Sequence, residues 1–139
     1  MKHLFNTVII FLVLFTTSIS AQNSTNIEKF NYIVSTVKTD QLKPIIETAI
    51  ALKKEDAQKF GDFQVIIYGK TVKELTNKEN LEKIIKEANS ANVKLLVCNM
   101  ALKKFEVDPK NIPQEFEVVD NAFTHILQMQ KQGYLSIQL

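Results

Sequence analysis

The chain has 139 residues, of which 45% are hydrophobic and 23% are charged, the balance of an ordinary globular protein. A formal net charge of +2 gives no electrostatic case for nucleic-acid binding, and the chain contains no tryptophan to stack on bases. All 17 basic residues are lysines, which excludes the bidentate guanidinium contacts that arginine makes with phosphate and carboxylate groups.

Residues 1–21 have the features of a secretory signal peptide. Lys2 and His3 give a weakly positive start, an apolar run at 8–15 follows, and small residues precede a cleavage point after Ser20 or Ala21. The apolar run is shorter than the ~20 residues that a membrane span needs, which favours cleavage over the alternative of a retained N-terminal anchor. No cysteine near the cleavage point could accept a lipid. We therefore predict an exported, periplasmic protein without membrane contact after cleavage.

Removal of 21 residues from 139 leaves a mature chain of 118 residues, 22–139. A chain of this length buries roughly two-thirds of the surface that its unfolded form exposes, so it can build a real core. It is too short for two domains of ordinary size. The sequence therefore predicts a single domain over 22–139.

The first half of the mature chain predicts two strands around one helix. Residues 30–37 are rich in β-branched and aromatic side chains, which favours a strand. Residues 63–68 form a nearly continuous apolar run, typical of a strand buried on both faces. Between them Pro44 stands near the start of a helix and Gly61 marks its exit, while Gly69 turns the chain after the second strand. The apolar residues of this helix repeat at helical spacing: Ile45, Ile46, Ala49, Ile50 and Leu52.

The middle of the chain predicts a second helix followed by a third strand. Thr76 and Glu79 have the spacing of a capping box, in which each side chain bonds the backbone N–H of the other residue. Residues 93–98 form a short apolar strand, and residues 99–104 form a short helical turn directly after it. One apolar face of the second helix repeats at i, i+3, i+4 and i+7: Leu81, Ile84, Ile85 and Ala88.

The last third predicts a loop, two weaker strands and a helix. Asp108 precedes Pro109 and is expected to organise the turn of the loop at 108–113. Residues 115–119 alternate as a weaker strand, and residues 134–137 form a closing strand, either in the core or at a subunit interface. The helix between these strands ends near Gly133 and is lined by Phe123, Ile126 and Leu127.

The alternation of strands and helices predicts the fold class. Strands that are apolar on both faces, with helices between them, favour an α/β protein, namely a three-layer α/β/α domain around a mostly parallel sheet of about five strands. The chain has three glycines and contains neither a G-x-G-x-x-G motif nor a P-loop. Dinucleotide or nucleoside triphosphate binding through a glycine-rich turn is therefore not expected.

Cys98 is the only cysteine of the chain, so an intramolecular disulfide is excluded. It ends a predicted strand and directly precedes a helical turn, and sites in open α/β sheets collect at the carboxyl ends of strands. Helix N–H groups favour an anion there and lower the pKa of a thiol. Asn99, Lys103 and Lys104 are the candidates to stabilise the thiolate. Two alternatives remain open, a buried cysteine that acts as a small hydrophobe and a disulfide between two chains.

Other chemistries lack their residues. His125 is interpreted as a surface histidine or one with a satisfied hydrogen bond, and one cysteine with two histidines does not make a zinc site. Glu115 and Glu117 alternate on one strand and indicate a solvated edge. Ser90 and Ser136 have no recognisable activating partner and no G-x-S-x-G context. Thiol chemistry is what remains.

Three stretches of the chain resemble the DsrE/DsrF-like family, which includes the sulfur-relay subunits of the Tus type. They are residues 63–69 (FQVIIYG), 93–104 (VKLLVCNMALKK) and 127–134 (LQMQKQGY). The resemblance runs from about residue 32 to residue 137. It implies the compact α/β fold of that family, assembly into homo-trimers or hexamers, and no metal or organic cofactor.

The same resemblance implies a role for Cys98 as the residue that accepts sulfur as a persulfide. The partner would then be a protein that donates or accepts sulfur. The basic pair and glycine that follow the family cysteine (Arg-Arg-Gly) are here Lys103, Lys104 and Phe105. An alternative function is a non-catalytic, oligomeric module of the same fold that binds a small ligand or a protein, with Cys98 inert.

Overall fold

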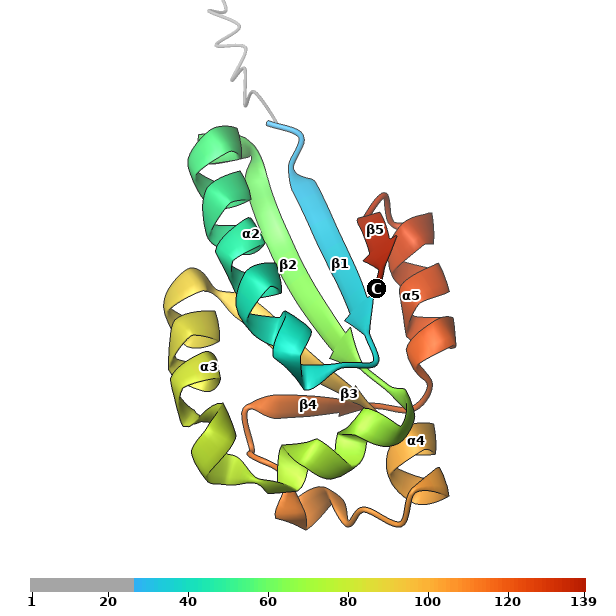
Figure 1. The fold of residues 1–139 in the computed structure, drawn as a ribbon. Coiled ribbons are helices and arrows are strands. Elements are labelled where there is room, and N and C mark those ends of the chain that lie inside the picture. Colours follow the sequence, from blue (N-terminus) through green and yellow to red (C-terminus); the bar gives the residue numbers. More distant parts are fainter. Residues whose placement is uncertain (1–26) are drawn as a thin grey trace, which may run out of the picture.

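The computed structural model describes residues 27–139, so the predicted signal peptide at 1–21, with its cleavage point and the alternative of an anchor, lies outside the described residues. Between residues 27 and 139, no helix is long and apolar enough to cross a membrane. Five strands form one sheet in the order β4-β3-β2-β1-β5, and every neighbouring pair is parallel (Figure 1). The strands are β1 (Phe30–Thr36), β2 (Phe60–Ile67), β3 (Val93–Cys98), β4 (Phe116–Val119) and β5 (Leu135–Gln138).

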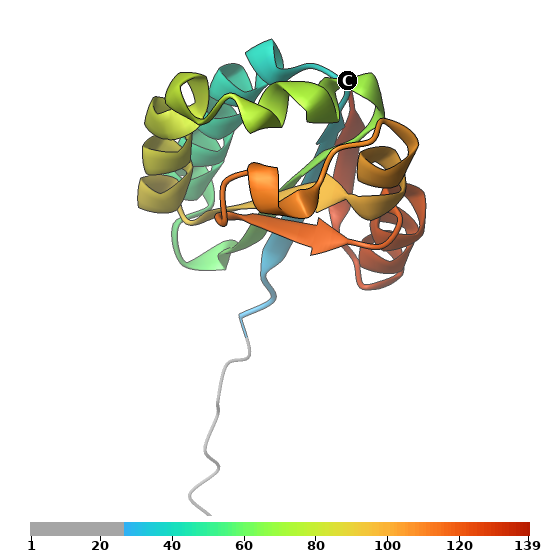
Figure 2. The ribbon, with the colours of Figure 1, turned by 90° about the horizontal axis from the view of Figure 1, so that it is seen from below.

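Helices cover both faces of the sheet and make the three layers that the sequence predicts. Figure 2 shows α2 and α3 together on one side of the sheet, with α4 and α5 on the other. Because parallel neighbours require a crossover, each of the strands β1 to β4 is followed by a helical segment that returns the chain to the same end. The carboxyl ends of all five strands therefore lie at one edge. The helices are α2 (Leu42–Asp56), α3 (Lys78–Ala91), α4 (Asn99–Lys104) and α5 (Ala122–Lys131).

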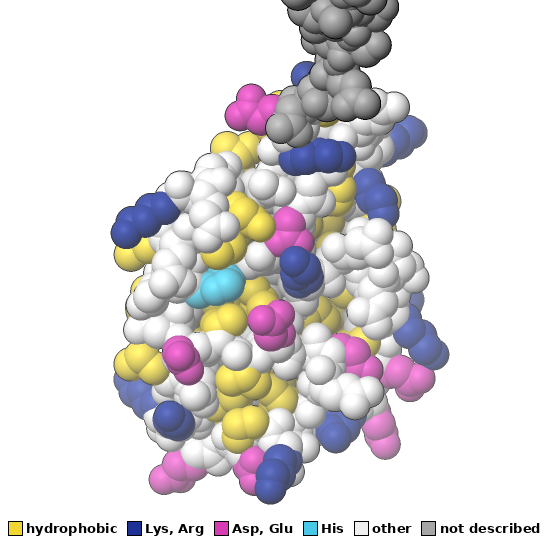
Figure 3. All heavy atoms as spheres, turned by 180° about the vertical axis from the view of Figure 1, so that it is seen from behind, with side chains coloured by type: hydrophobic (Ala, Val, Ile, Leu, Met, Phe, Trp, Pro, Cys, Tyr) yellow, Lys and Arg dark blue, Asp and Glu magenta, His cyan; other side chains and the backbone are white. Residues whose placement is uncertain are grey.

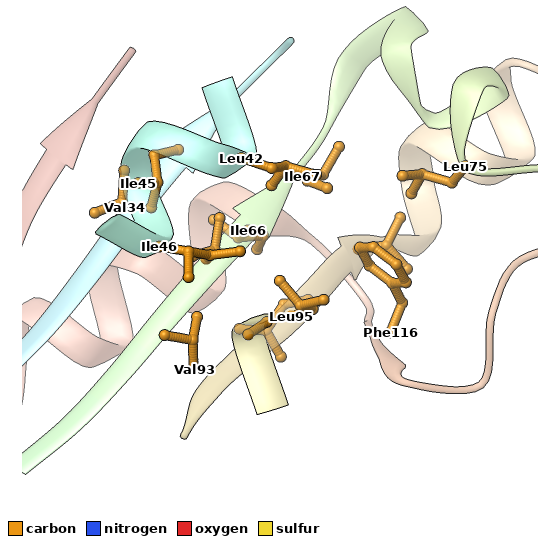
Figure 4. Packing of buried hydrophobic residues seen from close by; sticks show 14 of the residues in the cluster. Val34, Leu42, Ile45, Ile46, Ile66, Ile67, Leu75, Val93, Leu95 and Phe116 are labelled. Atoms are coloured by element: carbon orange, nitrogen blue, oxygen red, sulfur yellow. The ribbon is translucent and has the colours of Figure 1, made fainter. Parts of the chain in front are cut away.

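The main core lies between the sheet and the helices α2 and α3. The apolar face of α2 packs Leu42, Ile45 and Ile46 against the sheet (Figure 4). The periodicity predicts the buried positions of Ile45, Ile46 and Ala49, but it is wrong for Ile50, which is 51% exposed. Residues 63–67 of β2 are all buried, which confirms the prediction of a strand covered on both faces. Each such aliphatic side chain contributes about 1.5–3 kcal/mol when it is fully buried, so this layer carries most of the stability of the domain.

Gly61 does not mark the exit of the first helix. The helix ends at Asp56, and Gly61 lies inside β2, next to the irregular register between Phe30 and Tyr32 of β1. A Cβ atom at Gly61 would clash with the side chain of Asn31 and the carbonyl of Phe30. The prediction was wrong because the glycine serves the close approach of two strands and not the end of a helix.

The predicted capping box at Thr76 and Glu79 is also wrong. A 3-10 segment, Gly69–Thr76, extends through Thr76, whose hydroxyl donates to the carbonyl of Lys73 at 2.8 Å. The helix α3 starts one residue later than the box requires, and Asn77 caps it by accepting the N–H of Asn80. Because Thr76 belongs to the 3-10 segment and its hydroxyl bonds within it, the next residue, Asn77, caps the helix instead.

The predicted apolar lining of the last helix is only partly buried. Ala122 is the buried residue of α5, and Ile126 is half-buried, whereas Phe123 and Leu127 are each 57% exposed. The closing strand β5 lies at the sheet edge with Leu135 and Ile137 exposed, so its placement in the core is wrong and its role at an interface stays a prediction. Helical and strand periodicity identifies apolar faces but not what covers them.

The remaining elements match the sequence. The third strand and the helical turn after it have the predicted bounds, 93–98 and 99–104. Asp108 organises the turn before Pro109, because its carboxylate accepts the N–H of Lys110 at 2.9 Å. Glu115 and Glu117 are exposed at the edge of the sheet, as predicted.

Candidate functional site

Cys98 occupies the end of β3, a strand that is paired on both sides. Its backbone is extended and it caps the N-terminus of α4, so the chain turns from strand to helix at this residue. The backbone N–H of Met100 donates to the carbonyl of Asp120 at 3.2 Å and ties the first turn of α4 to the segment before α5. Two helix N-termini thereby meet at the carboxyl edge of the sheet, where ligand sites of open α/β sheets lie.

The sulfur of Cys98 accepts a backbone hydrogen bond from the start of α5. The N–H of Ala122, the first residue of that helix, donates to Sγ at 3.4 Å. Asn121 caps the helix and accepts the N–H groups of Phe123 at 2.9 Å and Thr124 at 3.4 Å. Because the first N–H groups of a helix have no partner within it, the cap leaves the Ala122 N–H free for the sulfur. An N–H donor at the positive end of a helix is the kind of group that favours a nearby anion.

A pocket of about 370 Å³ opens beside the sulfur. Cys98 is 5% exposed, so a reagent reaches it through this pocket and not from open surface. Aromatic rings form part of the wall, where Tyr68 and Phe123 pack edge to face with ring centroids 5.3 Å apart. The lining comes from the end of β2, from α4 and from the first turn of α5: Tyr68, Met100, Ala101, Phe105, Asn121 and Phe123.

The structure brings one of the three predicted anion-stabilising residues to the pocket. Lys104 lines it and is exposed, with its Nζ 5.7 Å from the ring centroid of Phe105. Lys103 is exposed and does not line the pocket, and Asn99 is half-buried outside the lining. Helical spacing explains this, because residues 101 and 104 share one face of α4 and residue 103 points elsewhere.

Comparison with known proteins agrees with this geometry. A sequence model described as the DsrE/DsrF-like family matches residues 10–139. The chain belongs to the DsrE/DsrF-like family. No curated protein matches the sequence. Among solved structures, a protein of unknown function from Methanobacterium thermoautotrophicum, MTH1491, is similar with a TM-score of 0.64 and 17% identity, covering 81% of this chain and 99% of that chain. At this identity the likeness shows the fold.

Sequence reasoning missed the groups that this DsrE/DsrF-like chain places around Cys98 from α5 and from the end of β2. An N–H donor such as that of Ala122 belongs to the backbone and leaves no signature in residue type. Asn121 before an apolar helix was a readable cap signal. Tyr68 follows β2, a neighbour of β3, and residues at the ends of adjacent parallel strands are expected to meet.

His125 lies outside the Cys98 pocket and has a hydrogen-bonding partner, as predicted. Its Nε2 is 2.7 Å from Oε1 of Gln64, a buried residue of β2. Gln64 also donates to Asp62, whose carboxylate pairs with Lys94 at 2.8 Å. Figure 3 looks onto this face and shows charged side chains of both signs among hydrophobic ones. These contacts hold α5 against the sheet. Within residues 27–139, no group of three His, Cys, Asp or Glu side chains could hold a metal ion.

Proposed function

We propose that this DsrE/DsrF-like protein carries sulfane sulfur as a persulfide on Cys98. The thiolate attacks the outer sulfur of a persulfide donor, a new S–S bond forms at Cys98, and the donor leaves as a thiol. The Ala122 N–H and the N-terminal end of α5 stabilise the anion before and after transfer. Lys104, at the pocket, adds a positive charge.

The observation that carries this proposal is the position of one sulfur atom. Sγ of Cys98 faces a pocket and accepts an N–H from a helix N-terminus, which is the environment that activates thiols. Membership of a sulfur-relay type of family supports it. No oxidant or reductant beyond the persulfide donor is needed, because the transfer exchanges the S–S bond of the donor for a new S–S bond at Cys98.

The direct test is the mass of the protein after exposure to a sulfane sulfur donor. Wild-type protein should gain the mass of about one sulfur atom on Cys98, reversible by a reducing thiol. Cys98→Ser is the matched control because it keeps the size of the side chain and removes the sulfur. An absence of mass gain in the wild type, or an equal gain in the serine variant, would refute the proposal.

The setting of this reaction is part of the same proposal. The segment at 1–21 would direct the protein out of the cytoplasm, into the periplasm, where it would exchange sulfur with a donor or acceptor protein. Mass spectrometry of the protein from its native host should find a chain that starts at or next to residue 22. A mature chain that retains Met1 would contradict export with cleavage.

The burial of Cys98 favours a second candidate function, a binding module of the same fold with an inert cysteine. Labelling separates the two. A small neutral alkylating reagent that enters the pocket should modify native Cys98 at a rate comparable to that of an ordinary thiol under the sulfur-carrier hypothesis. Protection of the native thiol by a factor of about a hundred or more, relative to the protein in denaturant, would favour the binding module.

A further inference from the structure

The pocket beside Cys98 is mostly apolar and carries one positive charge, and this lining bears on which ligands enter it. Its walls include Tyr68, Met100, Phe105 and Phe123, and Lys104 is the one charged residue among those that line it within the described part of the chain. Its volume of about 370 Å³ falls in the range of small-molecule sites. Met100 and Phe123 are 58% and 57% exposed, so two apolar side chains stand with the exposed Lys104 at the outer side of the pocket.

We infer that this pocket selects the sulfur donor, and that the donor is a small organic hydropersulfide with an uncharged, apolar substituent. This selectivity rests on the proposed function of Cys98. An apolar substituent gains by leaving water for the aromatic wall, whereas a highly charged donor loses hydration that one exposed lysine does not replace. Thiosulfate and the persulfides of hydrophilic peptides are donors of that second kind.

The transfer step balances without an external oxidant or reductant. Cys98 loses its proton, and its thiolate attacks the terminal sulfur of the donor R–S–S–H, forming the new S–S bond at Sγ. The S–S bond of the donor breaks, and its electron pair leaves with R–S⁻, which takes up the proton lost by Cys98. The products are the Cys98 persulfide and the thiol R–SH, whose group R is held against Phe123 and Met100.

The test compares two donors on the full chain. Benzyl hydropersulfide is the apolar probe and glutathione hydropersulfide is the charged one, both generated in solution, and the rate of a one-sulfur mass gain on Cys98 is measured. Each rate is divided by the rate of the same donor with N-acetylcysteine, which removes differences in intrinsic reactivity. We expect the corrected preference for the benzyl donor to be about tenfold, the scale of discrimination that one apolar subsite provides.

Two variants on the same helix locate the preference. Phe123→Ser removes a pocket wall and should reduce the preference several-fold. Leu127→Ser is the matched control, because Leu127 has the same 57% exposure on α5 but does not line the pocket. Met100→Ser, from α4, provides a second pocket variant, and circular dichroism checks that each variant is folded.

The outcomes are distinct. Equal corrected rates for the two donors, or an unchanged preference in both Phe123→Ser and Met100→Ser, would overturn the selectivity and leave the sulfur-carrier function standing. A loss of preference in Leu127→Ser as large as in Phe123→Ser would also overturn it. Loading of Cys98 by neither donor would refute the carrier function itself.

Discussion

At the scale of single residues, the site depends on how the first N–H groups of α5 are shared between the cap residue Asn121 and the sulfur of Cys98. Asn121 accepts two N–H groups of α5 and holds the helix start in the place where Ala122 meets the sulfur. Under the proposed function, the activation of Cys98 therefore depends on a residue that does not bond to it. The pair Asn121 and Asn77 allows this to be tested, because both are asparagine caps but Asn77 serves α3, and Asn121 alone of the two lines the Cys98 pocket.

We predict that Asn121→Ala and Asn77→Ala each lower the free energy of unfolding by about 1 kcal/mol, the usual cost of losing a helix cap. Denaturant titration measures this. Only Asn121→Ala should slow the sulfur loading of Cys98, since only that cap positions the Ala122 N–H. Equal loading rates in the two variants would mean that the helix start does not activate the sulfur.

The two lysines of α4 provide a second test at this scale. Lys104 lines the pocket and Lys103 does not, so Lys104→Met should lower the ratio of alkylation rates of Cys98 by iodoacetate and iodoacetamide by about two- to fivefold, the effect of one exposed charge. Lys103→Met should leave the ratio unchanged. The difference should shrink at high salt because exposed charges are screened. The same ratio in both variants would remove Lys104 from the site.

At the scale of elements, the polar cluster around Asp62 joins the last third of the chain to the sheet. Burial raises the pKa of Asp62, but hydrogen bonds from Lys94, Gln64 and Tyr134 outweigh it and hold the pKa below its ordinary value. Burial and the bond to Asp62 raise the pKa of Tyr134 to about 12. The folded state therefore favours the charged form of Asp62 and the neutral form of Tyr134.

The sign of the resulting pH dependence follows from these directions. A carboxyl group with a lowered folded pKa stabilises the protein above its unfolded pKa, about 3.9, and this contribution is lost as pH falls through the folded value. We predict that the difference in free energy of unfolding between wild type and Asp62→Asn, measured with urea, is largest near pH 6–7 and decreases below about pH 4. A difference that stays constant from pH 7 to pH 3 would contradict this role of the charge.

The sequence predicted the elements well because their signals are local. Residues 93–104 show the apolar run, the cysteine and the short helical turn in order, and their bounds are as predicted. Gly61 was misread because its close strand contact is with residues that are distant in the sequence, whereas Thr76 was misread because a neighbouring 3-10 segment extends through it and competes with the helix cap. Cys98 was found from its place on a strand, whereas the Ala122 N–H and the ring of Phe123 required the approach of α5.

At the scale of the whole molecule, the edge strand β5 presents Leu135 and Ile137 to solvent at 57% and 59% exposure. An apolar edge strand invites pairing with another chain unless it is covered. We therefore expect these side chains to be covered in a homo-oligomer, in line with the assembly that the family resemblance implies. The opposite edge, β4, provides a comparison through Val118, which is 42% exposed.

We predict that wild-type protein sediments as an oligomer and that Leu135→Lys combined with Ile137→Lys yields a folded monomer. Val118→Lys should leave the assembly intact, since it changes the other edge. Sedimentation velocity measures all three. A monomeric wild type, or an oligomer unchanged by the double substitution, would place the interface elsewhere or exclude it.

The end of the chain has a consequence for access to Cys98. Leu139 donates its N–H to the carbonyl of Ser35 at 2.9 Å, and the amide of Gln138 donates to the hydroxyl of Tyr68 at 2.7 Å. Tyr68 in turn packs on Phe123. Replacement of Gln138 by alanine would therefore free the Tyr68 hydroxyl and loosen the ring that shapes access to the thiol.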